Sequence, residues 1–398
     1  MNFPDKLQQK LTKRNELNAL RSLQVPSDLV DFYSNDYLGF AKSKPIFEQT
    51  HQLLLDQNFM INGATGSRLI SGNHRLYKET EELIAKFHNS EKALLFNSGY
   101  DANLGFFSAV PQRGDIILYD ELIHASIRDG IQLSNAKAYK FKHNDITHLE
   151  KQIMSVRELS NSKETLNEDS LRSKSRTQTS NVFIITESVF SMDGDSPDLV
   201  AMAKIANQYN TYLIVDEAHA LGVFGSQGKG LVQQLSLEKE IFARIVTYGK
   251  ALGCHGAAIL GSTELYTYLV NFSRSLIYTT GLPPHAIATI QIAYTHLQEE
   301  IIDSLHNKIQ HFINEIHRLQ LTDVFIKSNS AIHCCIISGT TKTKAIATQL
   351  QQKGFNVKPI LSPTVPEGEE RLRFCLHSFN SKDNISTVLT ELKTLIHL

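Results

Sequence analysis

Seven short apolar runs recur between residues 93 and 260, and stretches with helical spacing separate them. The runs cover residues 93–96, 116–118, 138–141, 182–185, 212–215, 244–247 and 257–260. Runs that are apolar on both faces and alternate with helices favour a mostly parallel sheet with helices on both sides. We therefore predict an α/β fold with a seven-stranded sheet. Functional side chains in such folds gather at the carboxyl ends of the strands.

A break at Pro283-Pro284 precedes a different pattern. Residues 286–319 show long helical periodicity. A strand at 331–337, a helix at 343–353, a strand at 371–376 and a helix at 384–395 follow. We predict an N-terminal segment at 1–50, a large domain at 51–285 and a small α+β C-terminal domain at 286–398. Residues 155–180 are polar and predict a flexible surface excursion from the large domain.

Charge and cysteine content narrow the class of protein. Lys and Arg number 40 against 41 Asp and Glu, so a nucleic acid or an anionic membrane surface is not an expected partner. No run approaches the roughly 18 apolar residues of a membrane helix, and residues 1–20 lack the apolar core of a secretion signal. The four cysteines have neither disulfide nor zinc spacing. We expect no metal, even at His333 beside Cys334, and a cytoplasmic location.

Lys250 follows the apolar run 244–247 and Gly249. A lysine at the mouth of a buried strand is poorly hydrated, which lowers its pKa and makes the free amine a usable nucleophile. Such an amine can form a Schiff base with a carbonyl compound, most often pyridoxal phosphate. Most lysines at strand ends are merely solvated, so the interpretation depends on the residues that accompany Lys250.

Asp216 ends the run 212–215, and His219 lies three residues later. A carboxylate at that edge can hold the protonated pyridine nitrogen of pyridoxal phosphate, and the histidine can donate to the ring's phenolic oxygen. A helix cap or surface ion pair is the ordinary alternative for Asp216. The letters Asp-Glu-Ala-His also name a helicase box, but a helicase needs a Walker A loop, and residues 225–230 lack Ser or Thr after their lysine.

Three further features fit a phosphorylated aromatic ring. Ser98, Gly99 and Tyr100 open a helix after a strand, where free N–H groups and the helix dipole favour a phosphate. Thr247 can add a hydroxyl to that phosphate. His124 follows the run 116–118 and can stack on the ring, although a core histidine or a helix cap is the ordinary reading of such a residue.

In this order, together with Glu187 to Asp195, these motifs resemble the α-oxoamine synthases, pyridoxal-phosphate enzymes of aminotransferase fold type I. The resemblance runs nearly end to end and omits residues 155–180. It implies that Lys250 carries the cofactor and acts as acid and base, with Asp216 on the pyridinium, His219 on the phenolic oxygen and His124 on the ring face. It further implies the following groups of site residues: Ser191 near the ring oxygen; Ser98, Gly99, Tyr100 and Thr247 on the phosphate; Thr279 and Thr280 reaching it from a neighbouring subunit; Arg373 on the amino-acid carboxylate; Asn35, Arg21 and Thr364 on the substrate side.

The neighbouring-subunit segment implies a homodimer with shared active sites. The loops at 249–258 and 363–368 and the pair Leu20-Arg21 are most similar to family members that join L-alanine to a pimeloyl thioester in biotin biosynthesis. The acyl donor is then pimeloyl-CoA or a pimeloyl carrier protein. Alternatives are members that use glycine or serine with another acyl-CoA, an aminotransferase of the same fold, and a non-catalytic scaffold. Ala220 and Cys254-His255 depart from the family pattern.

Overall fold

The computed structural model describes residues 3–17, 20–21, 23, 28–165 and 180–396. Its centre is a seven-stranded sheet in which β8 runs antiparallel to both neighbours and the other strands are parallel to one another. Each of the seven apolar runs forms one strand, which confirms the predicted sheet. In spatial order the strands are β2 (Lys92–Phe96), β8 (Ala257–Gly261), β7 (Ala243–Thr247), β6 (Tyr212–Asp216), β5 (Val182–Glu187), β3 (Ile116–Asp120) and β4 (Lys137–Phe141).

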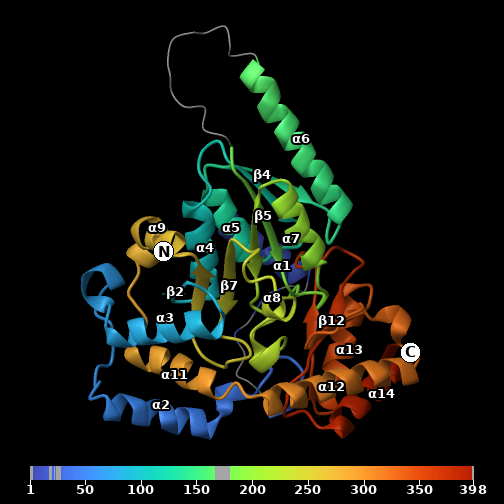
Figure 1. The fold of residues 1–398 in the computed structure, drawn as a ribbon. Coiled ribbons are helices and arrows are strands. Elements are labelled where there is room, and N and C mark those ends of the chain that lie inside the picture. Colours follow the sequence, from blue (N-terminus) through green and yellow to red (C-terminus); the bar gives the residue numbers. More distant parts are fainter. Residues whose placement is uncertain (1–2, 18–19, 22, 24–27, 166–179, 397–398) are drawn as a thin grey trace.

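Helices cover both faces of this sheet (Figure 1). Successive strand residues point to opposite faces, so neighbours such as Ile184 and Ile185 belong to two separate apolar clusters. Nearly continuous apolar runs were the signal for this two-sided burial. The helices of this part are α2 (Lys44–Asp56), α3 (Arg75–Phe87), α4 (Gly99–Ala109), α5 (Ala125–Leu133), α6 (Ile146–Thr165), α7 (Leu199–Gln208), α8 (Leu231–Gln234), α9 (Thr263–Phe272), α10 (Arg274–Ile277) and α11 (Pro284–Thr295).

The C-terminal part forms a smaller layer at one side of the molecule, coloured orange to red in Figure 1. Its antiparallel sheet has β12 (Arg371–Cys375) between β11 (Lys358–Ile360) and β9 (Ile332–Ile336). The N-terminal strand β1 (Val30–Asp31) pairs in parallel with β10 (Phe355–Asn356), which ties the start of the chain to this part. Its helices are α12 (Glu299–Arg318), α13 (Thr340–Gln352) and α14 (Lys382–Ile396).

One expectation needs correction. The polar stretch 155–180 is not an irregular excursion throughout, because α6 continues to Thr165 and projects away from the sheet (Figure 1). Leu149, Ile153 and Val156 are buried at helical spacing, so the apolar stripe extends into the polar stretch. Residues 166–179 lie outside the described residues. The predicted helical periodicity over 286–319 is confirmed: it corresponds to the helices α11 and α12, which are separated at residues 296–298.

The N-terminal helix α1 (Asp5–Glu16) leaves its Leu7 and Leu11 exposed. The predicted domain limits stay a prediction. Helix α11 packs against α2 and α3, whereas α12 packs against α14.

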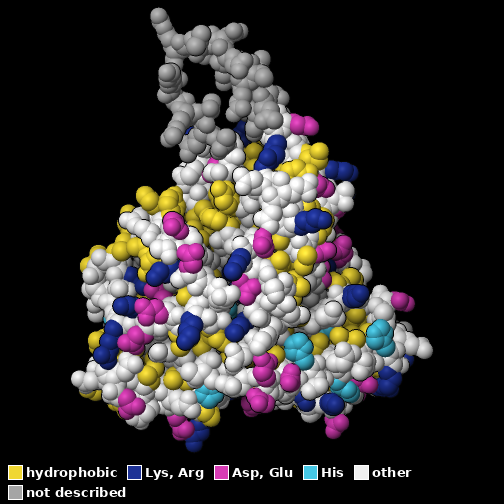
Figure 2. Space-filling model, in the orientation of Figure 1, with side chains coloured by type: hydrophobic (Ala, Val, Ile, Leu, Met, Phe, Trp, Pro, Cys, Tyr) yellow, Lys and Arg dark blue, Asp and Glu magenta, His cyan; other side chains and the backbone are white. Residues whose placement is uncertain are grey.

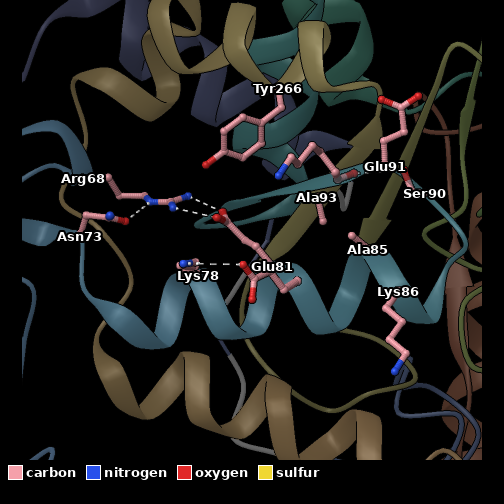
Figure 3. Close-up of a pocket in the computed structure, with 12 residues that line it drawn as sticks. Arg68, Asn73, Lys78, Glu81, Ala85, Lys86, Ser90, Glu91, Ala93 and Tyr266 are labelled. Carbon is pink, nitrogen blue, oxygen red and sulfur yellow. Dashed lines mark hydrogen bonds and ion pairs between the residues drawn. The ribbon is translucent and has the colours of Figure 1, made fainter.

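The edge strand β2 is protected by an ion pair rather than by another strand. Glu81 accepts a hydrogen bond from the Leu95 N–H at 2.8 Å, and Arg68 donates to the Leu95 carbonyl at 3.2 Å. Arg68 also meets Glu81 at 2.7 Å, as Figure 3 shows. These side chains satisfy backbone groups that an exposed edge leaves free for unwanted pairing.

A second ion pair fixes the strands that carry the candidate site. Glu217, directly after β6, accepts from Arg244 of β7 at 2.8 and 2.5 Å, and both side chains are buried. The other oxygen of Glu217 accepts from the Val232 N–H at 2.9 Å. The pair therefore joins the end of β6 to β7 and to α8.

Replacing Arg244 by Met is expected to leave the Glu217 carboxylate buried without its cation. Breaking a buried pair in this way costs about 3–5 kcal/mol. Lys78→Met is the matched control, because the Lys78–Glu82 pair is 80% and 65% exposed and such pairs contribute about 0–1 kcal/mol. Urea unfolding followed by circular dichroism measures both. Equal midpoints for the two variants would contradict the assigned role of the Arg244 pair.

Candidate active site

Lys250 lies beyond the carboxyl end of β7, where the sheet brings it to His219. Its Nζ is 2.7 Å from His219 Nε2. Burial lowers the pKa of Lys250 to about 8, against the opposing effects of the Asp216 and Glu187 carboxylates. Burial and the Lys250 charge also hold the pKa of His219 well below its usual range. The site thus contains a neutral imidazole beside an amine that loses its proton easily.

Asp216 ends β6 as predicted and is 5% exposed. Its oxygens accept hydrogen bonds from the Asn103 side-chain amide at 2.9 Å and from the Ala218 N–H at 2.9 Å. Glu187 ends β5 directly opposite Asp216 in the strand register. Burial and the nearby Asp216 charge raise the pKa of Glu187 to about 8. Two buried carboxyl groups therefore face the same edge, and Lys250 is the nearby cation.

His124 is the N-cap residue of α5, so its ordinary reading as a helix cap holds in this structure. Its Nδ1 lies 2.7 Å from Ser126 Oγ and accepts from the Ser126 N–H at 3.2 Å. Its backbone N–H donates to Glu187 at 2.5 Å. Burial and the Lys250 charge lower the pKa of the imidazole. The cap therefore fixes a neutral ring at the same sheet edge as Lys250.

The predicted phosphate turn lies at the N-terminus of α4. Ser98 caps that helix through its hydroxyl, which accepts from the Asp101 N–H at 3.1 Å. A Cβ placed on Gly99 would lie 3.4 Å from Thr247 Oγ1, so the helix terminus and the end of β7 are adjacent. Tyr100 is exposed and donates to Asp129 at 2.6 Å. The N–H groups at this helix terminus suit a phosphate. The Thr247 hydroxyl lies beside them and donates to the Gly256 carbonyl at 3.2 Å.

Thr279 and Thr280 contact the residue that precedes this turn. The Asn97 side-chain amide donates to Thr279 Oγ1 at 3.1 Å and to the Thr280 carbonyl at 2.8 Å. Both contacts are made within one chain. The reach of this segment into a neighbouring subunit stays a prediction.

Arg373 and Asn35 meet although 338 positions separate them, at 2.8 Å from Nη2 to Oδ1. Tyr37 joins them, with its hydroxyl 3.3 Å from Asn35 Oδ1 and 2.7 Å from His219 Nδ1. Arg373 is buried, and its Nε has no acceptor among the described residues. A buried guanidinium N–H without an acceptor fits an anionic ligand such as a carboxylate.

Three predicted residues are not drawn into these contacts. Ser191 is half-buried in the turn after β5. Thr364 is exposed, and its N–H bonds the Leu361 carbonyl. Arg21 is exposed and has no hydrogen-bond partner among the described residues. Their predicted roles toward the ring oxygen and the acyl substrate stay predictions.

Sequence reasoning assigned no role to Tyr37, Asn103 or Glu187. Glu187 carried a usable signal, because it ends an apolar run as Asp216 does and so reaches the same edge. Asn103 is a polar residue on the buried side of α4, a pattern that helical spacing could have marked. Nothing near Tyr37 in the sequence indicated a histidine 182 positions away.

A charged cluster beside the site joins the two parts of the molecule. His143 lies 2.9 Å from Asp120 and 2.9 Å from Asp195, and these carboxylates raise its pKa to about 10 against the effect of burial. Arg371 of β12 pairs with Asp193 in the same turn as Asp195. His143, Asp193 and Asp195 each offer a ligand atom within 4.8 Å of the others, an arrangement that would also suit a cation. In the described residues these side chains form ion pairs with one another.

A cleft of about 580 Å³ lies away from Lys250, beside β2. Figure 3 shows Arg68, Glu81 and Lys78 on its wall, where Arg68 forms an ion pair with Glu81 and Lys78 forms one with Glu82.

Acidic and basic side chains are interspersed over the face drawn in Figure 2. No helix among the described residues is long and apolar enough to cross a membrane.

Known proteins resemble the chain over nearly its whole length. The family model of class I and II aminotransferases matches residues 27–392. The chain belongs to the class I and II aminotransferase family. An 8-amino-7-oxononanoate synthase of Emericella nidulans is 40% identical and is matched over 98% of this chain and 95% of its own length.

Solved structures of the same fold agree with this family assignment. The 8-amino-7-oxononanoate synthase of Francisella tularensis is 28% identical, with a TM-score of 0.74 over 93% of this chain and 98% of its own. A serine palmitoyltransferase from S. paucimobilis with bound PLP and myriocin is 23% identical, with a TM-score of 0.83 over 98% of this chain and 96% of its own. The latter likeness shows the fold alone. The predicted fold type I is thereby confirmed. Membership of the aminotransferase family confirms the predicted dependence on pyridoxal phosphate.

The residues present fit that cofactor. Asp216 is buried, accepts hydrogen bonds from neutral amides, and suits a protonated ring nitrogen. Lys250 is a buried amine of lowered pKa, and the α4 terminus with Thr247 offers phosphate donors. The contacts of the residues therefore support their predicted places around the cofactor, although the individual assignments stay predictions.

Replacing His143 by Gln is expected to change how stability depends on pH. The folded pKa of His143, about 10, lies above its ordinary value of 6.5. Its stabilising contribution is therefore complete below pH 6.5 and is lost as the pH rises through about 10. Urea unfolding between these limits should show stability falling more steeply in the wild type than in the variant. Parallel slopes would contradict a charged His143.

Proposed function

We propose that this protein condenses L-alanine with a pimeloyl thioester, releasing CO2 and the thiol and forming 8-amino-7-oxononanoate in biotin biosynthesis. The observation that carries the proposal is the joining of Lys250, His219 and Asp216 at one sheet edge with Arg373 bonded to Asn35 beside them. That arrangement offers an amine of lowered pKa and a carboxylate-binding arginine. The 40% identical relative from Emericella nidulans bears the name of this activity.

Arg373 and Asn35 position the amino acid. The free Nε–H of Arg373 suits the alanine carboxylate, because a guanidinium can bind a carboxylate through two parallel hydrogen bonds. Asn35 holds Nη2 of Arg373 and so limits the orientation of the guanidinium. The amino group and α-carbon of alanine would then face Lys250.

Lys250 moves the proton of the reaction. With a pKa of about 8, roughly a tenth of the Lys250 amine is unprotonated at pH 7, one pH unit below that pKa. This free amine can take the α-proton of alanine. Pyridoxal phosphate, when bound, supplies an electron sink for the carbanion, and Asp216 keeps its ring nitrogen protonated. The carbanion attacks the thioester carbonyl, the thiol leaves, the carboxylate departs as CO2, and Lys250 Nζ returns a proton.

The proposal also covers the oligomeric state, the cellular location and the acyl donor. Tyr278 is exposed next to Thr279 and Thr280, which suits contact with a second copy of the chain in a homodimer with shared sites. The four cysteines are free thiols, which agrees with a reducing cytoplasm. Pimeloyl-CoA and a pimeloyl carrier protein are the two candidate acyl donors.

A thiol-release assay tests the proposed substrates. Pimeloyl, acetyl, succinyl and palmitoyl thioesters are each combined with alanine, glycine and serine, and free thiol and CO2 are measured. We expect the highest kcat/KM for alanine with a pimeloyl thioester. A preference for serine with palmitoyl-CoA or glycine with acetyl-CoA would move the protein to another α-oxoamine synthase activity, and no release with any pair would refute the synthase assignment.

Lys250→Ala is expected to abolish turnover and the near-visible absorbance of the covalently held cofactor, because the amine that carries both roles is gone. Cofactor bound by the remaining contacts should still appear in equilibrium dialysis. Circular dichroism checks that the fold is intact. Turnover by this variant at the wild-type rate would contradict the assignment of Lys250 as the residue that carries the cofactor and takes the α-proton.

Arg373→Lys keeps the charge but loses the planar fork that suits a carboxylate. The loss of one charge-assisted hydrogen bond, about 1.5–3 kcal/mol, should raise the KM for alanine at least about tenfold. The KM for the acyl thioester should change much less. Steady-state kinetics with each substrate varied in turn separates these effects, and an unchanged alanine KM would place the carboxylate elsewhere.

A further inference from the structure

We propose that Tyr37 is a positioning residue that fixes the tautomer of His219 and thereby makes His219 Nε2 the hydrogen-bond donor toward Lys250. The proposal rests on the proposed function, since it concerns the amine that takes the substrate proton. It adds a residue to the site that acts through another side chain.

The Tyr37 hydroxyl has two possible acceptors. His219 Nδ1 is 2.7 Å away, and Asn35 Oδ1 is 3.3 Å away. A strong O–H···O bond is about 2.5–3.0 Å long, so the contact with Asn35 is the weaker of the two. Asn35 Oδ1 already accepts from Arg373 at 2.8 Å. The hydroxyl proton of Tyr37 therefore goes to His219 Nδ1.

This assignment fixes the other nitrogen of the ring. A neutral imidazole has one N–H, and the low pKa of His219 keeps the ring neutral. If Nδ1 accepts, Nε2 carries the hydrogen and points it at Lys250 Nζ across 2.7 Å. Lys250 must then accept, which only its unprotonated amine can do. Tyr37 thus favours the form of Lys250 that can take a proton.

Other charges around Lys250 act in both directions. Asp216 and Glu187 favour the protonated amine, and Arg373 disfavours it. Burial raises the pKa of the Tyr37 phenol well above its usual range, so Tyr37 stays a neutral donor. Its side chain is fully buried, and a phenylalanine would fill the same space without the hydroxyl. The groups that face Lys250 are Asp216, Glu187, His219, His124, Arg373 and Cys375.

The test uses the full chain freed of cofactor. Nitrogen-15 NMR of histidine-labelled wild type, with the His219 signal assigned through His219→Asn, is expected to show Nε2 bearing the hydrogen. In Tyr37→Phe this preference should be lost. The pH midpoint for chemical labelling of Lys250, measured by mass spectrometry, should rise by about one pH unit, equivalent to one neutral hydrogen bond.

Tyr294→Phe is the matched control. Tyr294 is also buried, and its hydroxyl lies 2.9 Å from Nε2 of another buried histidine, His88. Loss of the Tyr294 hydroxyl should leave the tautomer of His219 and the pH midpoint for labelling of Lys250 unchanged. The proposal is overturned if wild-type His219 carries its hydrogen on Nδ1, a readout that does not depend on the variants folding. The proposal is also overturned if the Tyr37→Phe variant folds and the pH midpoint for labelling of Lys250 does not change. Failure of the proposed function is a separate outcome, because it would appear only as absent thiol release in the substrate assay.

Discussion

The desolvation of Lys250 is the constraint on which the rest of the site depends. A buried ammonium is costly, and Asp216 and Glu187 on neighbouring strands offset part of that cost. Lys250 in turn limits the repulsion between those two carboxyl groups. The neutral ring of His219 lies against the amine without adding charge. The charges are therefore balanced closely enough for the amine to gain or lose a proton near neutral pH.

The sheet creates this balance by bringing strand ends together. β5 and β6 are parallel and in register, so their last residues, Glu187 and Asp216, lie side by side. The parallel neighbour β7 then brings Lys250 to the same edge. The buried pair of Glu217, which follows Asp216, and Arg244 of β7 joins the end of β6 to β7. Side chains separated by dozens of residues thus occupy one small volume because the backbone ladders hold them there.

Features that depend on local sequence pattern could be predicted from the sequence. Apolar runs marked every strand of the large sheet, and their order along the chain placed Asp216, His219 and Lys250 at one edge. Contacts between segments that are distant in the sequence could not be predicted in this way. The contact of Tyr37 with His219 depends on how the N-terminal segment docks, and composition hid the continuation of α6 through residues 155–165. Local propensity carries no information on such docking, because tertiary packing decides it.

In the proposed reaction, the arrangement of the C-terminal part links substrate binding to proton transfer. Arg373 comes from β12, and Arg371 on the same face of that strand is held by Asp193 of the large part. Asn35 and Tyr37, from the segment that follows β1, connect Arg373 to His219 and so to Lys250. A carboxylate that bound the free Nε–H of Arg373 would satisfy a buried donor at one end of this chain of hydrogen bonds. Lys250 stands at the other end. In the proposed reaction, the contacts that orient the amino acid would therefore also orient the amine that takes its proton.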